Sequence, residues 1–385
     1  MFRNILQLFT RTFWHPFTDP RRATILIGSF FGMAGFWIIN FISSYDFAAV
    51  SSAALTQYLA MQFGGLAVIS GLLYLGFAAA DGKIWRGCLM AGLIAAFILF
   101  LNSPGTPLWQ GGVAALMSAL YWGSLHVTMT HNSTDDNRGF EVALLGVMSL
   151  AGAVTAAVAS ASLLSVDKPL IGIILAMLCL ITGTGCMLLT ARIQPRITAR
   201  AYIKSIAAVW QEHAGFLKMM AMRSVFESSG QLTTALMSLL HFPPAMAATL
   251  ITARVILEFI FAPLIGKLAH NLSQRGYITG IACIATGWIG IAVAPHSPYL
   301  FLICLLVIGL GSRLVAAGIH VGMYALKSYP AMFWTEAVLG TGRLLFIFAM
   351  MPLLYYSPQF YACAVAGIAL FMLVFSWHRT RTNHV

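Results

Sequence analysis

Residues 169–218 begin with the run PLIGIILAMLCLITGTGCMLLT and continue as ARIQPRITARAYIKSIAAVWQEHAGFLK. The first part has no charged residue and is long enough for a transmembrane helix, since about 20 apolar residues cross the hydrocarbon core of a bilayer. The second part places five lysines and arginines around Pro195 and the apolar residues 206–210. This change predicts that a membrane span ends near residue 190 and that a cytoplasmic linker with an amphipathic helix follows.

The rest of the chain is also mainly apolar. Of its 385 residues, 59% are hydrophobic and 9% are charged, and its mean hydropathy is +0.85. No ordinary soluble domain has this composition, so we predict an all-α membrane protein with no room for a soluble catalytic domain. Apolar runs predict twelve spans, at 23–43, 54–79, 87–102, 109–129, 141–164, 169–190, 219–240, 245–266, 277–294, 298–322, 332–356 and 358–376.

The spans divide into six before the linker and six after it. We therefore expect a cytoplasmic amphipathic arm at 1–22, a six-helix bundle at 23–190, the linker at 191–218, a second six-helix bundle at 219–376 and a cytoplasmic tail at 377–385. Seventeen of the 22 lysines and arginines then lie in cytoplasmic segments, and only Lys168 lies outside. This positive-inside bias predicts a multi-pass protein of a bacterial-type inner membrane with both termini in the cytoplasm.

The net charge of +11 is therefore a topology signal and gives no support for nucleic-acid binding. The six cysteines lie in apolar stretches without CxxC or Cys/His spacing, so we expect neither a disulfide framework nor a metal site. No HExxH or GxSxG motif occurs, and we expect no enzyme activity and no cofactor.

Two loops at equivalent places in the two halves carry a family resemblance. Residues 76–86 read GFAAADGKIWR and residues 266–276 read GKLAHNLSQRG. Together with the six-plus-six plan, they resemble the loop signature G-x-L-A-D-R-x-G-R-R of the major facilitator superfamily. The first copy has one extra residue before Asp81, and the second has His270 where the family has aspartate. Loop 133–139 is similar to the N-R-G that opens span 5 in this family.

The resemblance implies two six-helix bundles that alternate access to a central cavity. It also implies a gating role for charged residues at the cytoplasmic loops, which here are Asp81, Lys83, Arg86, Arg138, Lys267 and Arg275. The alternative is that these residues form ordinary solvated loops whose charges only set the topology.

Seven ionisable residues lie within spans of the second half, where a charge needs a polar cavity or a partner. They are Arg223, Glu227, Arg254, Glu258, Arg313, Glu336 and Arg343. The first four form two i, i+4 pairs that can each neutralise themselves within one helix. Arg313 has no acidic residue in its own span, so we expect one surplus arginine that attracts an anion.

These residues define the candidate site. We expect substrate binding by Arg254, Arg313 and Arg343, because guanidinium groups suit carboxylate or phosphate, with Gln231, Tyr121 and Trp122 completing the cavity wall. Glu227, Glu258 and Glu336 are candidates for proton coupling, and His126 is a further candidate relay. The alternative is an interhelical charge network that stabilises one conformation and contacts no substrate.

The sequence thus predicts a monomeric secondary transporter in the lipid bilayer. Its expected cargo is a small polar molecule, anionic or zwitterionic, with protons as the coupling ion and export favoured slightly over import. The alternative is a non-transporting membrane assembly factor or chaperone on the same fold. Solute flux in liposomes that depends on a pH gradient distinguishes the two.

Overall fold

The computed structural model describes residues 19–79, 90–98, 106–132, 138–190, 204, 208, 210–212, 214–271, 273–325 and 329–382. Within these ranges the chain is helical apart from short turns, which confirms the all-α prediction. Residues 90–98 are helical, inside the third predicted span. The long helices are α2 (Pro20–Val50), α3 (Ser52–Ala79), α5 (Pro107–Asn132), α6 (Arg138–Ser165), α7 (Pro169–Thr190), α9 (Ala214–Leu239), α10 (Pro244–Asn271), α11 (Ser273–Val293), α12 (Pro298–Ala325), α13 (Tyr329–Tyr356) and α14 (Pro358–Thr382).

The helix ends follow local chemistry. Six of the described long helices begin with proline, namely α2, α5, α7, α10, α12 and α14. Proline suits this position because its missing N–H would have no partner in the first turn. At α2 the Asp19 side chain also caps the helix by accepting a hydrogen bond of 3.0 Å from the Arg21 backbone N–H. Several helices extend beyond the predicted spans, since hydropathy detects only the apolar part of a helix that continues into the interface.

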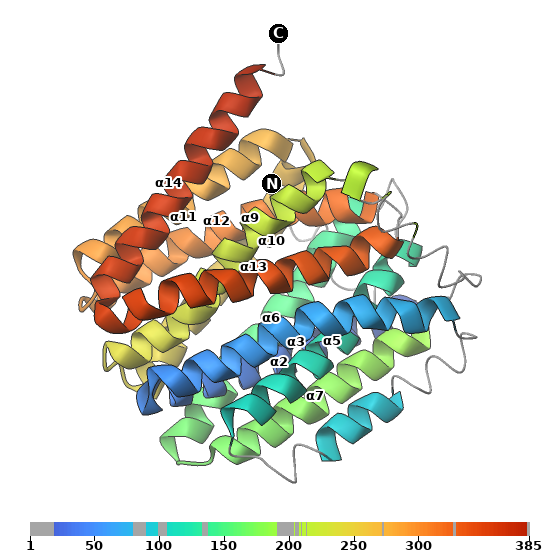
Figure 1. Cartoon of the computed structure of the whole chain (residues 1–385), viewed down its shortest axis with the longest axis horizontal. Helices are drawn as coiled ribbons and strands as arrows, with labels where there is room; N and C mark the ends of the chain where they lie inside the picture. Colours follow the sequence, from blue (N-terminus) through green and yellow to red (C-terminus); the bar gives the residue numbers. More distant parts are fainter. Residues whose placement is uncertain are drawn as a thin grey trace, which may run out of the picture.

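The helices form two groups that follow the order of the chain (Figure 1). Helices α2, α3, α5, α6 and α7 form the N-terminal group, and α9 to α14 form the C-terminal group. The most extensive contacts between the groups are those of α3 with α13, α6 with α10 and α2 with α9, and smaller contacts join α6 to α12 and α5 to α12 and α13. The interface between the groups therefore runs along the length of the molecule.

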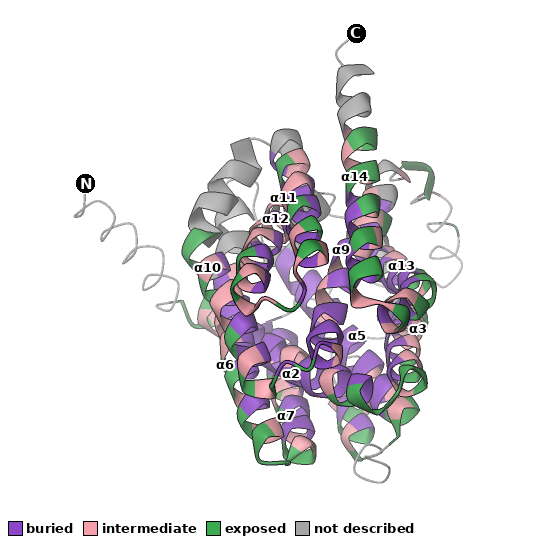
Figure 2. Cartoon of the chain, turned by 90° about the vertical axis from the view of Figure 1, so that its left-hand side faces the viewer, coloured by how far each residue is buried: buried purple, intermediate pink, exposed green. Residues whose placement is uncertain are grey.

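The outer surface of the described part is apolar, as a lipid-facing surface requires. Large hydrophobic side chains such as Leu189, Leu345 and Phe371 are 76%, 65% and 72% exposed, whereas buried residues gather in the interior (Figure 2). Such a surface is a liability in water but is the expected one in lipid. Seven of the described helices, namely α2, α6, α7, α11, α12, α13 and α14, contain a window long and apolar enough to cross a membrane. Twelve crossings remain a prediction.

Hydrogen bonds join the two groups near one end of the interface. The Tyr45 hydroxyl donates to the Phe242 carbonyl at 2.6 Å, and the Ser238 hydroxyl donates to the Tyr45 carbonyl at 3.1 Å. The Tyr355 hydroxyl likewise donates to the Ala48 carbonyl at 3.1 Å. In the predicted orientation this end faces the outside of the cell, so the groups are joined there.

Candidate functional site

A cavity of about 230 Å³ lies between the two helix groups. Its N-terminal wall comes from α2, α5 and α6, and its C-terminal wall comes from α9, α10, α12 and α13. Every candidate ionisable residue of the second half lines it. The polar and aromatic lining residues are Phe36, Trp37, Asn40, Trp122, His126, Ser149, Arg223, Glu227, Gln231, Thr234, Arg254, Glu258, Ser312, Arg313, Glu336 and Arg343, together with Phe41 and Phe226.

Glu258 holds two arginines on one side of the cavity. Arg254 Nε donates to Glu258 Oε1 at 2.8 Å within α10, and Arg313 Nε donates to Glu258 Oε2 at 2.6 Å from α12. Only 5% of the Glu258 side chain is exposed. We call Arg254, Glu258 and Arg313 the first triad; it carries a formal charge of +1.

The first triad needs a glycine in the neighbouring helix. A Cβ atom at Gly309 would lie 2.5 Å from Glu258 Oε1 and 2.9 Å from Arg254 Nε. Since real Cβ atoms do not approach other heavy atoms so closely, a larger residue at position 309 would displace the Glu258 and Arg254 side chains from this arrangement. The glycine at position 309 thus has a packing explanation.

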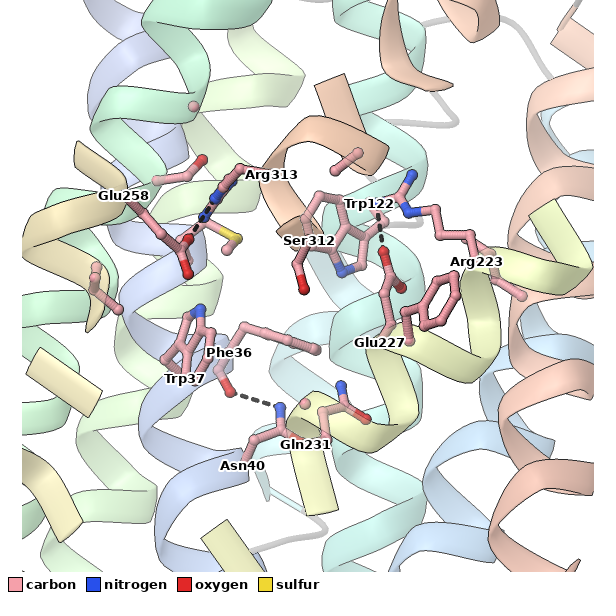
Figure 3. A pocket seen from close by; sticks show the side chains of 18 of the residues that line it. Phe36, Trp37, Asn40, Trp122, Arg223, Glu227, Gln231, Glu258, Ser312 and Arg313 are labelled. Carbon is pink, nitrogen blue, oxygen red and sulfur yellow. Dashed lines mark hydrogen bonds and ion pairs between the residues drawn. The ribbon is translucent and has the colours of Figure 1, made fainter. Parts of the chain in front are cut away.

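Glu227 holds the other two arginines. It pairs with Arg223 one turn earlier in α9 and with Arg343 from α13. The Arg343 guanidinium carbon also lies 5.5 Å from the centroid of the Phe63 ring, within the range of a cation–π interaction. We call Arg223, Glu227 and Arg343 the second triad; it also carries a formal charge of +1. Figure 3 shows Glu258 with Arg313 and Glu227 with Arg223 on opposite sides of the cavity.

Glu336 pairs with a histidine of the other helix group. His126 Nε2 lies 2.9 Å from Glu336 Oε1, and the two side chains are 4% and 9% exposed. The His126 ring stacks on Trp122 with a centroid distance of 5.9 Å and an interplanar angle of 25°. This hydrogen-bonded pair therefore links α5 to α13 across the interface of the two groups.

The structure corrects one part of the predicted charge pattern. We expected each i, i+4 pair to neutralise itself and Arg313 to remain as the surplus cation. Both i, i+4 pairs do form, but each glutamate also holds an arginine from another helix. Arg313 therefore has a carboxylate partner in Glu258. Each triad carries a formal charge of +1, and the third glutamate, Glu336, belongs to neither triad. Sequence spacing shows partners within a helix and gives no signal for partners in other helices.

Of the remaining candidate substrate-binding residues, two line the cavity and one does not. Gln231 and Trp122 line the cavity, as predicted. Tyr121 does not line it; the ring is fully buried, and its hydroxyl lies 3.4 Å from the Ser29 carbonyl oxygen. Trp37 and Phe36 on α2 face the cavity beside Asn40 (Figure 3).

The predicted gating residues fall outside what the structure describes. Asp81, Lys83 and Arg86 lie outside the described residues. Arg138, Lys267 and Arg275 lie in α6, α10 and α11, but their side chains are outside the described part. Their gating role stays a prediction.

No protein-family model and no curated protein matches the chain. Several solved structures match over nearly the whole length. The human organic anion transporter MFSD10 (TETRAN) superposes with a TM-score of 0.66 at 11% identity, covering 93% of this chain and 100% of that one. A bacterial homologue of the iron transporter ferroportin in the outward-facing state gives 0.65 at 13% identity, covering 92% and 96%. The nucleoside transporter NupG gives 0.67 at 12% identity, covering 94% and 99%. At these identities the comparison establishes a shared fold.

Proposed function

Since the chain has the fold of the major facilitator transporters, we propose that it is a secondary transporter of a small anionic or zwitterionic solute. One observation carries the proposal. Four arginines from four helices of the C-terminal group converge on one cavity between the two groups. Arginines within spans are tolerated where they face a polar chamber and have partners, and such positions commonly mark a substrate pathway.

The location of the arginines supports alternating access. Arg223, Arg254, Arg313 and Arg343 each lie well inside their helices, about 9 to 13 residues from the nearer helix end, which corresponds to roughly 14–20 Å at 1.5 Å per residue. A site near the bilayer midplane at the interface of two bundles is the arrangement that alternating access requires. The transporters reported above carry different cargoes by their names, so the cargo of this chain is proposed from its own residues.

We further propose that protons drive the transport. The His126–Glu336 pair is the best-placed proton site, because a His–Glu pair can bind one more proton on the imidazole while its hydrogen bond is kept. It also bridges the two helix groups, so a change in its charge acts on the interface that must open. Glu227 and Glu258 fit this role less well, since neutralising either would leave two partly buried arginines close together without a carboxylate.

Reconstitution tests the proposal. The purified protein is placed in liposomes that contain a pH-sensitive dye, and benzoate, phosphate, alanine and terephthalate are added in turn under an imposed pH gradient. We expect at least one solute to move protons and to accumulate faster than in liposomes without protein. If every solute moves at the same rate in liposomes with and without the protein, the result would support the non-transporting assembly factor instead. Everted membrane vesicles then give the direction, for which we propose export.

A further inference from the structure

The two triads form a repeated binding feature. Each consists of one glutamate that holds one arginine from its own helix and one from another helix, Arg254 and Arg313 in the first triad and Arg223 and Arg343 in the second. The triads use different helices, α10 with α12 and α9 with α13. Figure 3 shows them on opposite sides of the cavity. The cavity therefore presents two separate positive sites rather than one.

The charge of each triad favours an anion at each site. A carboxylate between two guanidinium groups balances only one of them, so each triad keeps a formal charge of +1. A charge that is removed from water costs free energy unless an opposite charge lies close to it. The third carboxylate of the lining, Glu336, is hydrogen-bonded to His126 at 2.9 Å and belongs to neither triad. Two positive triads at separate places are balanced best by a solute with two separate anionic groups.

Two residues of the cavity lining each have a buried polar atom without a hydrogen-bond partner. Arg343 Nε and Gln231 Oε1 are buried and have no hydrogen-bond partner among the described residues. Buried polar groups in proteins are nearly always hydrogen-bonded, so such atoms point to a ligand or solvent partner. Arg343 belongs to the second triad, and Gln231 lies one turn after Glu227 on α9. The N–H donor without a partner, Arg343 Nε, therefore belongs to the second triad.

The aromatic residues of the cavity wall favour a particular shape and polarity for the part of the solute that lies between its two anionic groups. On the N-terminal side the cavity is lined by Phe36, Trp37 and Trp122, with Phe36 and Trp122 packed edge to face at a centroid distance of 6.0 Å. Rigid aromatic surfaces favour a flat apolar group over a hydrated one. The volume of about 230 Å³ is below the roughly 300–1,000 Å³ of drug-sized sites, so the solute is small.

We infer that the cavity binds small organic dianions, in which a flat apolar body separates two anionic groups and each group binds one triad. This inference rests on the proposed transport function and narrows it. A zwitterion is disfavoured because its ammonium group needs a carboxylate. Glu227 and Glu258 are each engaged by two arginines, and Glu336 is engaged by His126. A monoanion is disfavoured because it leaves one triad without its balancing charge.

A matched ligand series tests the inference by calorimetric titration of the full-length protein in detergent. The probes are terephthalate, isophthalate and 2,6-naphthalenedicarboxylate as dianions, 4-methylbenzoate as the monoanion and 4-(aminomethyl)benzoate as the zwitterion. We expect at least one dianion to bind about ten- to hundredfold more tightly than 4-methylbenzoate, which is the gain from one additional charged hydrogen-bonded site. If no dianion binds more tightly than the monoanion and the zwitterion, the inference is wrong.

Variants of the two triads give a second measurement. In Arg313→Lys and in Arg343→Lys the positive charge stays while the guanidinium fork is lost, so each variant should weaken dianion binding more than 4-methylbenzoate binding and thereby lower the dianion preference. An unchanged dianion preference in both variants would overturn the assignment. Because these readouts measure binding, they separate the two proposals. Transport of monoanions at the rate of dianions defeats only the dianion inference, whereas dianion binding without any flux defeats only the transport function.

Discussion

His126 Nε2 and Glu336 Oε1 lie 2.9 Å apart and form a buried hydrogen-bonded pair between α5 of the N-terminal group and α13 of the C-terminal group. In the predicted orientation α5 runs inward and α13 runs outward, and the pair lies 19 residues after the start of α5 but only 7 after the start of α13. Both positions are therefore in the cytoplasmic half of the membrane. The hydrogen bonds of Tyr45 and Tyr355 join the groups at the opposite end. The cavity thus lies between two sets of contacts that must break alternately for transport.

Glu336→Gln should uncouple transport from protons. The amide keeps the size and a hydrogen-bonding group but cannot bear the charge that pairs with protonated His126. We expect loss of solute accumulation driven by a pH gradient, while exchange of labelled for unlabelled solute continues. Internal pH and solute uptake in proteoliposomes provide the measurement. Glu212→Gln, in the exposed part of the linker, is the matched control and should behave as the unaltered protein. Accumulation that survives in Glu336→Gln would assign coupling to another group.

Arg313→Gln and Arg343→Gln should abolish transport without preventing membrane insertion. Each removes one guanidinium group from the cavity, and each glutamate keeps its second arginine, so no carboxylate is left without a partner. Loss of a buried charged contact to a ligand reduces affinity by about thirtyfold or more. Initial rates at equal amounts of inserted protein provide the measurement. Arg22→Gln is the control, because that side chain is 46% exposed at the start of α2. Normal flux in both cavity variants would reduce these arginines to a structural network.

Glu258→Gln should destabilise the protein, and a second substitution should restore part of the loss. Without the carboxylate, Arg254 and Arg313 remain buried side by side with no balancing charge. Removing one partner of a buried ion pair costs about 3–5 kcal/mol. The double variant Glu258→Gln with Arg313→Gln removes one of the repelling cations and should unfold at a higher temperature than Glu258→Gln alone. Thermal unfolding in detergent measures both, and a double variant less stable than the single one would contradict the charge argument.

The helices were predictable from the sequence because membrane spans obey a simple rule. Each of the predicted spans overlaps a helix in the described residues, and differences in length arise where helices continue into polar surroundings, as α2 does from Pro20. The high cost of placing charges in lipid also allowed the ionisable residues of the cavity to be predicted from the sequence. All seven ionisable candidates of the second half line one cavity.

The partners within the site were not predictable. Arg343 and Glu336 share α13, yet Arg343 pairs with Glu227 on α9 and Glu336 pairs with His126 on α5. These choices depend on which helices are neighbours and at what height their side chains meet, and a single sequence gives no signal for either. Tyr121 illustrates the same limit, since adjacent Trp122 lines the cavity while Tyr121 packs into the N-terminal core.

Gly309→Ala should impair the first triad specifically. The added methyl group would lie 2.5 Å from Glu258 Oε1, so the ion pair or α12 must move. Overpacking of a tight site costs about 1–3 kcal/mol, and we expect weaker solute binding together with lower thermal stability. Gly367→Ala in α14 is the matched control, because nothing lies within 4 Å of a Cβ atom there. Equal effects of the two substitutions on binding would show that Gly309 has no particular relation to the triad.

Cysteine labelling should establish the orientation on which the transport proposal depends. The six native cysteines are first replaced by serine or alanine, and single cysteines are then introduced at exposed positions as Val166→Cys, His296→Cys, Lys204→Cys and Glu212→Cys. With cytoplasmic termini and twelve crossings, the turns after α6 and α11 face outward and the linker faces inward. A membrane-impermeant maleimide added to intact cells should therefore label the first two variants and should label the last two only after the cells are opened. Labelling of Lys204→Cys in intact cells would require an odd number of crossings before the linker or an inverted orientation, and either one would place the His126–Glu336 pair at the wrong side of the membrane for the proposed proton coupling.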